Sequence, residues 1–107
     1  MARLLMIGLR LVAGSDDAAL VDLVRSALVI ARSKGYLSEF PARLARTEAG
    51  TLLLLAELVS VRTVDAMDED PELQDVIMQI SALAESFPLH SLVEFNANRV
   101  TFETLGA

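Results

Sequence analysis

Apolar residues occupy both the odd and the even positions of the segment TLLLLAELVS, residues 51–60. Successive side chains of a strand point to opposite faces, so as a strand this segment would be apolar on both sides. Both faces of such a strand need to be covered by other apolar surfaces, although the chain has only 107 residues. We therefore expect helices on one side of it and a second copy of the chain on the other.

Three further segments carry strand patterns. Residues 3–13 form a first strand, and residues 37–46 form a second one that pairs with 51–60 as a hairpin. Pro41 has no backbone N–H, so the second strand should lie at an edge of the sheet or carry a bulge. Residues 89–95 are expected as a fourth strand, and residues 98–105 as an extended tail or a fifth strand.

Apolar residues at three- and four-residue spacing predict two main helices. The first begins with Ser15 as its N-cap and runs to about Lys34. The second begins with Asp70 as its N-cap and Pro71 at the first helical position, and it runs to about Ser86. Their expected buried stripes are Leu20, Leu23, Val24, Ala27, Leu28 and Ala31 in the first helix, and Leu73, Val76, Ile77, Ile80, Leu83 and Ala84 in the second.

The predicted order is strand, helix, strand, strand, helix, strand, with a short helix over residues 61–69 before the second main helix. This is the βαββαβ plan of the ferredoxin-like α+β fold. We expect an antiparallel sheet with both main helices on one face, built as a single domain over residues 1–107. With a second copy on the other face, the assembly would be a dimeric α+β barrel, that is, a homodimer joined through its sheet faces.

Composition adds to the case for an oligomer and argues against several partners. Hydrophobic residues make up 53% of the chain, and the mean hydropathy of +0.47 is high for a small domain with much surface to cover. A net charge of −6 with nine scattered Lys and Arg residues argues against nucleic acid or an anionic membrane as a partner. The sequence has no cysteine, which excludes disulfides and thiolate chemistry. Arg10 interrupts the N-terminal apolar run, so we interpret that run as a strand rather than a signal peptide and expect a cytoplasmic protein.

Four short motifs stand at the junctions between these elements: Lys34-Gly35-Tyr36, Glu48-Ala49-Gly50-Thr51, Ala56 to Ser60, and Asp70-Pro71-Glu72-Leu73. Together they resemble the antibiotic biosynthesis monooxygenase type of dimeric α+β barrel, over residues 3–95. Families of this kind include cofactor-independent oxygenases of quinol- or anthrone-like aromatics, haem-degrading enzymes and aromatic polyketide cyclases. The resemblance implies a small cofactor-independent monooxygenase-like enzyme that holds an aromatic or polyketide-type substrate in an apolar pocket between sheet and helices.

Two positions depart from that oxygenase pattern. Leu58 stands where many members have Trp, and Met67 stands where His is often found. The chain has no Trp at all, so it does not match the haem-degrading subtype, which needs Asn, Trp and His in the pocket. The segments MARLLMIGLRL and DPELQDVIMQI resemble small polyketide cyclases of the same fold. A polyketide cyclase and a non-catalytic ligand-binding or interaction protein therefore stay open as alternatives.

Four side chains are candidates for catalysis, each with a structural alternative. His90 would be a general base near neutral pH, or a partly exposed residue at the end of a strand. Tyr36 would donate its hydroxyl to a substrate oxygen, or pack at a helix–strand corner. Arg10 would bind an enolate, phenolate or carboxylate oxygen, and Glu57 would act as a base with a raised pKa. Alternatively, Arg10 and Glu57 would form an ion pair across the sheet or the dimer interface.

Motifs for a metal or a nucleotide are missing from the sequence. The acidic run Asp65, Asp68, Glu69 and Asp70 lacks the glycine and the spacing of a calcium loop, and we interpret it as the solvated start of a helix. The sequence contains neither a glycine-rich phosphate loop nor a Cys/His metal pattern. We therefore expect no cofactor and no metal, and an enzyme that works by enclosing an apolar small-molecule substrate.

Overall fold

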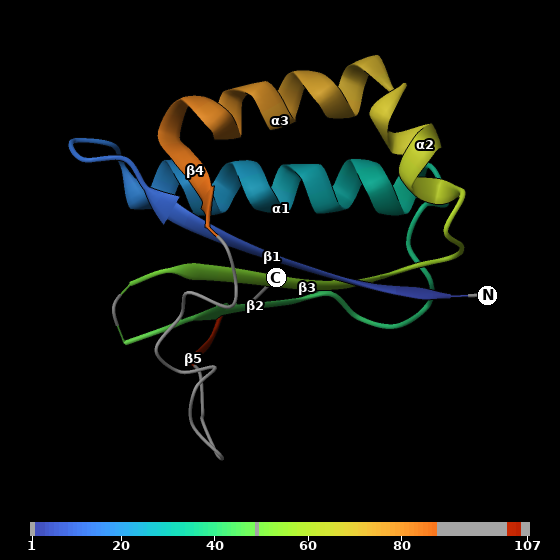
Figure 1. The fold of residues 1–107 in the computed structure, drawn as a ribbon, viewed down its shortest axis with the longest axis horizontal. Helices are drawn as coiled ribbons and strands as arrows, with labels where there is room; N and C mark the ends of the chain where they lie inside the picture. The colour runs from blue at the N-terminus through green and yellow to red at the C-terminus, as the bar shows by residue number, and fades with distance from the viewer. Residues whose placement is uncertain (1, 49, 88–102, 106–107) are drawn as a thin grey trace.

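The computed structural model describes residues 2–48, 50–87 and 103–105. The described elements are, in order, β1 (Arg3–Leu11), α1 (Asp17–Ser33), β2 (Arg43–Arg46), β3 (Leu52–Leu58), α2 (Thr63–Asp68), α3 (Pro71–Leu83), β4 (Ala84–Phe87) and β5 (Glu103–Leu105). All strand pairs are antiparallel and form one sheet in the order β4-β1-β3-β2-β5. The helices α1 and α3 lie on the same side of this sheet (Figure 1). The chain is therefore an α+β protein whose strand order is consistent with a ferredoxin-like fold.

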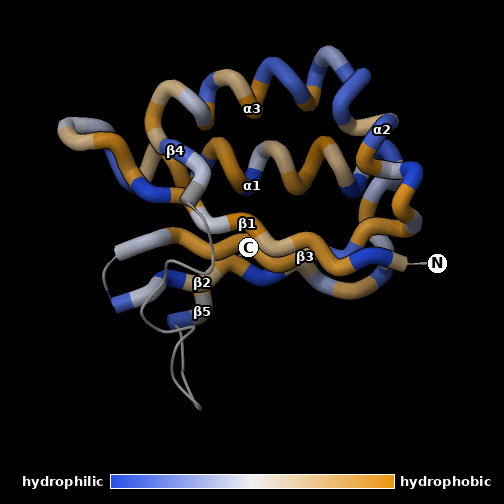
Figure 2. Tube along the Cα trace, viewed as in Figure 1, coloured by the Kyte–Doolittle hydropathy of each residue, from blue (hydrophilic) through white to orange (hydrophobic). Residues whose placement is uncertain are grey.

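The register of β1 against β3 decides which side chains face the helices. Leu5 lies opposite Ala56, Ile7 opposite Leu54, and Leu9 opposite Leu52. Residues opposite each other share a face of the sheet, so these pairs form one continuous apolar surface. Figure 2 shows that hydrophobic residues dominate β1 and β3 where these strands pass beneath α1.

The core lies between this surface and α1. Its fully buried side chains include Leu20 and Val24 of α1, Leu44 of β2 and Leu52 of β3. A second cluster groups Ala31, Leu37, Ala56 and Leu58 near the other end of α1. The predicted stripe of α1 is therefore confirmed at its most buried positions.

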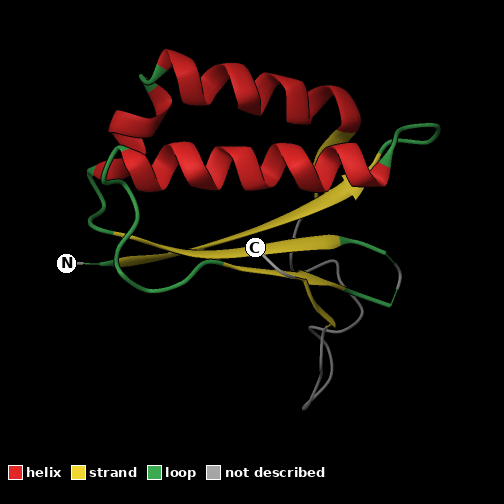
Figure 3. Cartoon of the chain, turned by 180° about the vertical axis from the view of Figure 1, so that it is seen from behind, coloured by secondary structure: helices red, strands yellow, loops and turns green. Residues whose placement is uncertain are grey.

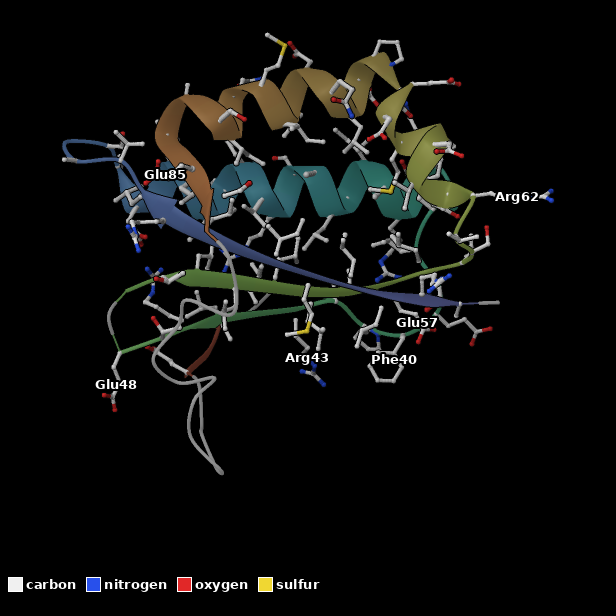
Figure 4. All side chains as sticks on the ribbon, in the orientation of Figure 1. Phe40, Arg43, Glu48, Glu57, Arg62 and Glu85 are labelled. Atoms are coloured by element: carbon white, nitrogen blue, oxygen red, sulfur yellow. The ribbon has the colours of Figure 1, made fainter. Side chains whose placement is uncertain are left out.

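The opposite side of the sheet, which we call the outer face, is covered only in part by the described residues. Leu53 is buried there and Leu55 is half-buried. Leu4 and Met6 of β1, by contrast, are 61% and 45% exposed. Phe40, which precedes β2, is also exposed and lies on this side of the sheet (Figure 4). The double-sided apolar pattern of residues 51–60 thus corresponds to one face packed under helices and one face that is partly open.

The helix α1 begins one residue later than the sequence predicts. The carboxylate of Asp16 accepts a hydrogen bond from the N–H of Ala18 at 3.0 Å, so Asp16 and not Ser15 is the N-cap. The N–H of Ser15 instead bonds to the carbonyl of Val12, in the turn that closes β1. Asp17 then binds Arg46 of β2 through two hydrogen bonds of 2.8 and 2.9 Å, which ties the start of α1 to the sheet.

The second predicted strand, residues 37–46, is shorter than expected. Only Arg43–Arg46 forms β2, although Leu37 makes an isolated bridge with Leu58 of β3. Between them the Ser38 hydroxyl accepts a hydrogen bond from the N–H of Phe40, and Pro41 has no N–H to donate. The N–H of Ser38 still donates to the carbonyl of Glu57 at 2.9 Å, and the local turn then takes residues 39–42 out of the hydrogen-bonding ladder.

The end of α3 also differs from the prediction. Asp70 is the N-cap as expected, but the helix ends at Leu83 rather than near Ser86. Ala84 is extended (φ −148°, ψ 159°), and it begins β4 opposite Leu11 of β1. Residues Ala84–Phe87 therefore form the strand that pairs with β1 on the side opposite β3. The predicted strand 89–95 lies outside the described residues, as do positions 98–102 of the predicted tail, whose end pairs with β2 as β5.

The helix α3 buries less of its apolar stripe than predicted. Of the predicted stripe, only Leu73 is fully buried within α3, whereas Ile77 is 36% exposed. The reason is its position: α3 packs against α1 and meets the sheet through β4. Figures 1 and 3 show α3 farther from the sheet than α1.

Candidate functional site

A cavity of about 400 Å³ lies between the sheet and the two long helices. β1 and β3 form one wall with Leu5, Ile7, Leu9, Leu54 and Ala56. The other walls come from one side of α1, from the sheet-facing side of α3, and from Leu37 and Met67. The cavity therefore occupies the space left beneath the raised helix α3.

Small side chains keep this space open. Ala27 and Ala31 of α1 line the cavity together with Ala56 of β3 and Ala84 at the start of β4. A methyl group at each of these positions leaves room that a leucine would fill. A concave and mostly apolar surface of this kind is suited to an apolar ligand.

Polar side chains line the cavity only at the junction of α3 with β4, as far as its described walls show. They are Ser81 and Ser86; Glu85 lies between them on β4 (Figure 4), but it pairs with Arg10, so its side chain belongs to the outer face of the sheet. The hydroxyl of Ser81 donates to the carbonyl of Ile77 at 3.0 Å, so its oxygen remains an acceptor for another group. This end of the cavity therefore offers hydrogen-bond acceptors, while the rest of the described wall is apolar.

Arg10 and Glu57 lie far apart in one chain. The register places Arg10 opposite Glu85 and Glu57 opposite Leu4, six residues away along β1. At the rise of a strand this separation is about 20 Å. The predicted ion pair across the sheet of one chain is therefore wrong, and both side chains belong to the outer face. His90, the third candidate, lies outside the described residues.

Tyr36, the fourth candidate, contacts the start of α3 instead of the cavity. Its hydroxyl donates to Oδ2 of Asp70 at 2.6 Å, and Nζ of Lys34 contacts Oδ1 of Asp70 at 2.8 Å. The Asp70 side chain also accepts from the N–H groups of Glu72 and Leu73, at 3.0 and 3.2 Å. We call Lys34, Tyr36, Asp70 and Glu72 the Asp70 cluster; it joins the end of α1 to the start of α3.

The contacts of the Asp70 cluster stabilise the ionised form of the Asp70 carboxyl group and so hold α1 and α3 together. The hydrogen bonds from Lys34 and then from Tyr36 hold the pKa of the Asp70 carboxyl well below its usual range. The same bond to Asp70 raises the pKa of the Tyr36 hydroxyl above its usual range. Asp70 is only 6% exposed, and its role as the centre of this cluster was missed from the sequence, where it showed only as a helix cap.

The described residues contain neither a group of side chains that could hold a metal ion nor a helix that could cross a membrane. Within residues 2–48, 50–87 and 103–105, no three His, Cys, Asp or Glu side chains gather closely enough to hold a metal ion. The helices of these segments are too short or too polar to cross a membrane.

Comparison of the chain with family models, with curated proteins and with solved structures finds no match. The family resemblance therefore stays a prediction that rests on its motifs.

Proposed function

We propose that the protein binds a small apolar molecule in the cavity between the sheet and the helices. The observation that carries this proposal is the cavity itself, about 400 Å³ in volume, with described walls that are apolar except at the α3–β4 junction. Sites for small molecules are typically concave, of about 300–1,000 Å³, and mostly apolar with a few polar groups that fix orientation. An apolar ligand would gain free energy here by leaving water.

Filling the cavity is expected to weaken the binding of an apolar ligand. Replacing Ala27 with Phe places an aromatic ring in the space beneath α3, so the affinity for an apolar probe such as 2-naphthol should fall by about tenfold or more. Titration followed by the fluorescence of 2-naphthol measures this affinity.

Ala18→Phe is the matched control, because Ala18 is exposed in the first turn of the same helix. It should leave the affinity within about twofold of the wild-type value, an effect expected of surface changes. Equal affinities for the wild type and Ala27→Phe would place the probe elsewhere and contradict the proposal.

A second candidate function is catalytic, and the acceptor groups at one end of the cavity favour it. In the monooxygenase-like version, an aromatic substrate loses a ring CH₂ proton to solvent and binds as its anion between the apolar walls. That electron-rich anion itself reduces O₂: a ring CH₂ becomes C=O with one oxygen atom, and the other oxygen leaves as water. In the polyketide cyclase version, the same cavity folds the substrate chain for an aldol closure.

Oxygen uptake distinguishes these activities from binding alone. The test uses anthrone and hydroquinone substrates with chelator-treated protein, and compares the wild type with Ala27→Phe, which fills the cavity. Uptake above the uncatalysed rate that falls at least tenfold in Ala27→Phe supports the oxygenase. Uptake equal to the uncatalysed rate contradicts it and leaves the binding function.

Two copies would associate through the outer face. Support comes from the exposed apolar side chains Leu4, Met6 and Phe40, and from two opposite charges beside them. Figure 4 shows Arg43 and Glu57 on the same side of the sheet, away from the helices. In a two-fold assembly one surface meets its own copy, so Arg43 of each chain could approach Glu57 of the other. Such a homodimer would form the dimeric α+β barrel expected from the sequence.

A charge in the outer face is expected to separate the two copies. Met6→Asp places a carboxylate in a surface that the dimer would bury, so the protein should sediment as a monomer at micromolar concentration. The control is Met78→Asp, which changes an exposed methionine on α3, away from the outer face. A wild-type chain that already sediments as a monomer would contradict the dimer.

A further inference from the structure

The cavity follows two elements, β1 and α3, that run beside each other. Along β1 it extends from Leu5 to Leu9, and along α3 from Leu73 to Ser81. At the rise of a strand and of a helix, these spans correspond to about 13 and about 12 Å. Figure 1 shows both elements running in the same direction, so the two spans describe one axis of the cavity.

The volume and this length together limit the width of a ligand. A cavity of about 400 Å³ that extends over roughly 12 Å has a mean cross-section of roughly 30 Å². That cross-section admits one carbon chain or one flat ring system end-on. An elongated molecule therefore fits the cavity better than a broad one.

The two ends of the axis differ in chemistry. Leu37, Met67 and Leu73 line the end near Leu5, and both Leu37 and Leu73 are buried. Ser81 and Ser86 line the other end. The Ser81 hydroxyl already donates to the carbonyl of Ile77, so its oxygen suits a ligand group that donates a hydrogen bond, and an ionised carboxylate, which only accepts, is disfavoured there.

We propose that the ligand is a single medium-length chain with an uncharged hydrogen-bond donor, such as a hydroxyl group, at one end. The donor lies at the α3–β4 junction and the chain extends toward Leu37 and Met67. A span of about 12 Å accommodates roughly eight to twelve carbons in extended form. This inference rests on the proposed binding function and adds the class of the ligand to it.

A series of linear alcohols tests the length. Calorimetric titration with 1-hexanol, 1-octanol and 1-decanol should show affinity rising about threefold or more for each added CH₂ that is buried. Decanoate at pH 7 should bind at least tenfold more weakly than 1-decanol, because its carboxylate cannot donate a hydrogen bond to Ser81 and would lose its hydration in an apolar cavity. These measurements need no variant that perturbs the core.

Shortening the apolar end gives an independent readout. Ala31 lines the cavity near that end, so Ala31→Leu should weaken 1-decanol about tenfold while 1-hexanol changes by less than about threefold. Ala18→Leu, on the exposed part of the same helix, is the control and should change neither affinity.

The outcomes separate the two proposals. One result is that wild-type protein binds 2-naphthol, Ala27→Phe does not, and none of the alcohols competes with 2-naphthol. The cavity then binds compact aromatic molecules, and the proposal of a chain-like ligand is overturned. If decanoate and 1-decanol bind with equal affinity, the proposal that the ligand donates a hydrogen bond at the α3–β4 junction is overturned. If neither 2-naphthol nor any alcohol binds, the proposed binding function falls together with this inference.

Discussion

Replacing Leu44 with Ala is expected to lower the free energy of unfolding by about 3 kcal/mol. The Leu44 side chain is completely buried, and it belongs to the same core cluster as Leu20, Val24 and Leu52. Truncation removes buried apolar surface and leaves a cavity that its neighbours fill only partly. Domains of this kind are stable by about 5–15 kcal/mol in total, so the loss would be a large fraction of the stability.

Equilibrium denaturation in urea measures this loss. The matched control is Met78→Ala, which truncates an apolar side chain of similar size at a position 72% exposed. The control should change the free energy of unfolding by less than about 0.5 kcal/mol. Similar losses in the two variants would show that β2 is not packed against α1 as the structure has it.

Replacing Asp70 with Ala is expected to lower the melting temperature by about 10 °C. The variant removes the N-cap of α3 and leaves the Tyr36 hydroxyl and the Lys34 ammonium without the carboxylate that both contact. Because these contacts join α1 to α3, the helix above the cavity should loosen. Differential scanning calorimetry measures the shift. Asp75→Ala, at an exposed position of the same helix, should shift the melting temperature by no more than about 2 °C.

The charge of Asp70 should also give stability a specific pH dependence. Its pKa is lower in the folded protein than the ordinary value of 3.8. A carboxyl group of this kind stabilises the fold above its unfolded pKa, and the stabilisation is lost as the pH falls toward the folded pKa. The melting temperature of the wild type should therefore fall as the pH drops below about 4.

Asp70→Asn isolates this contribution, because Asn remains a good N-cap but carries no titrating charge. Its melting temperature should be lower than that of the wild type at pH 7, and the difference should shrink between about pH 4 and pH 2. Asp75→Asn should keep the wild-type pH profile. Parallel curves for the wild type and Asp70→Asn would contradict the role given to the Lys34 and Tyr36 contacts.

Local signals in the sequence located most of the elements. Asp70 followed by Pro71 marks the start of α3 correctly, because a cap and a proline act within one turn of the helix. The start of α1 was misplaced by one residue, since both Ser15 and Asp16 are good caps and the turn after β1 selects between them. Such choices depend on the neighbouring turn rather than on the helix.

Long-range contacts account for what the sequence did not reveal. Ala84, Glu85 and Ser86 continue the pattern of α3, yet pairing with β1 makes them a strand. Tyr36 and Asp70 are 34 residues apart, and no local pattern links them. The cavity depends on alanines from different elements facing a common space, whereas each alanine by itself is typical of an ordinary core position. The fold class was therefore predictable, but the walls of the site were not.

The position of β1 inside the sheet, between β4 and β3, has a consequence for synthesis of the chain. β1 is made first, yet its two neighbours are β3, residues 52–58, and β4, residues 84–87. At about 5–20 residues per second, a ribosome needs roughly 4–15 s after finishing β1 to add β4. One edge of a nascent apolar strand is unpaired throughout this interval. Arg3 and Arg10 lie at the two ends of its apolar run. When two nascent copies on one messenger RNA meet, the like charges of these residues oppose pairing of their β1 strands.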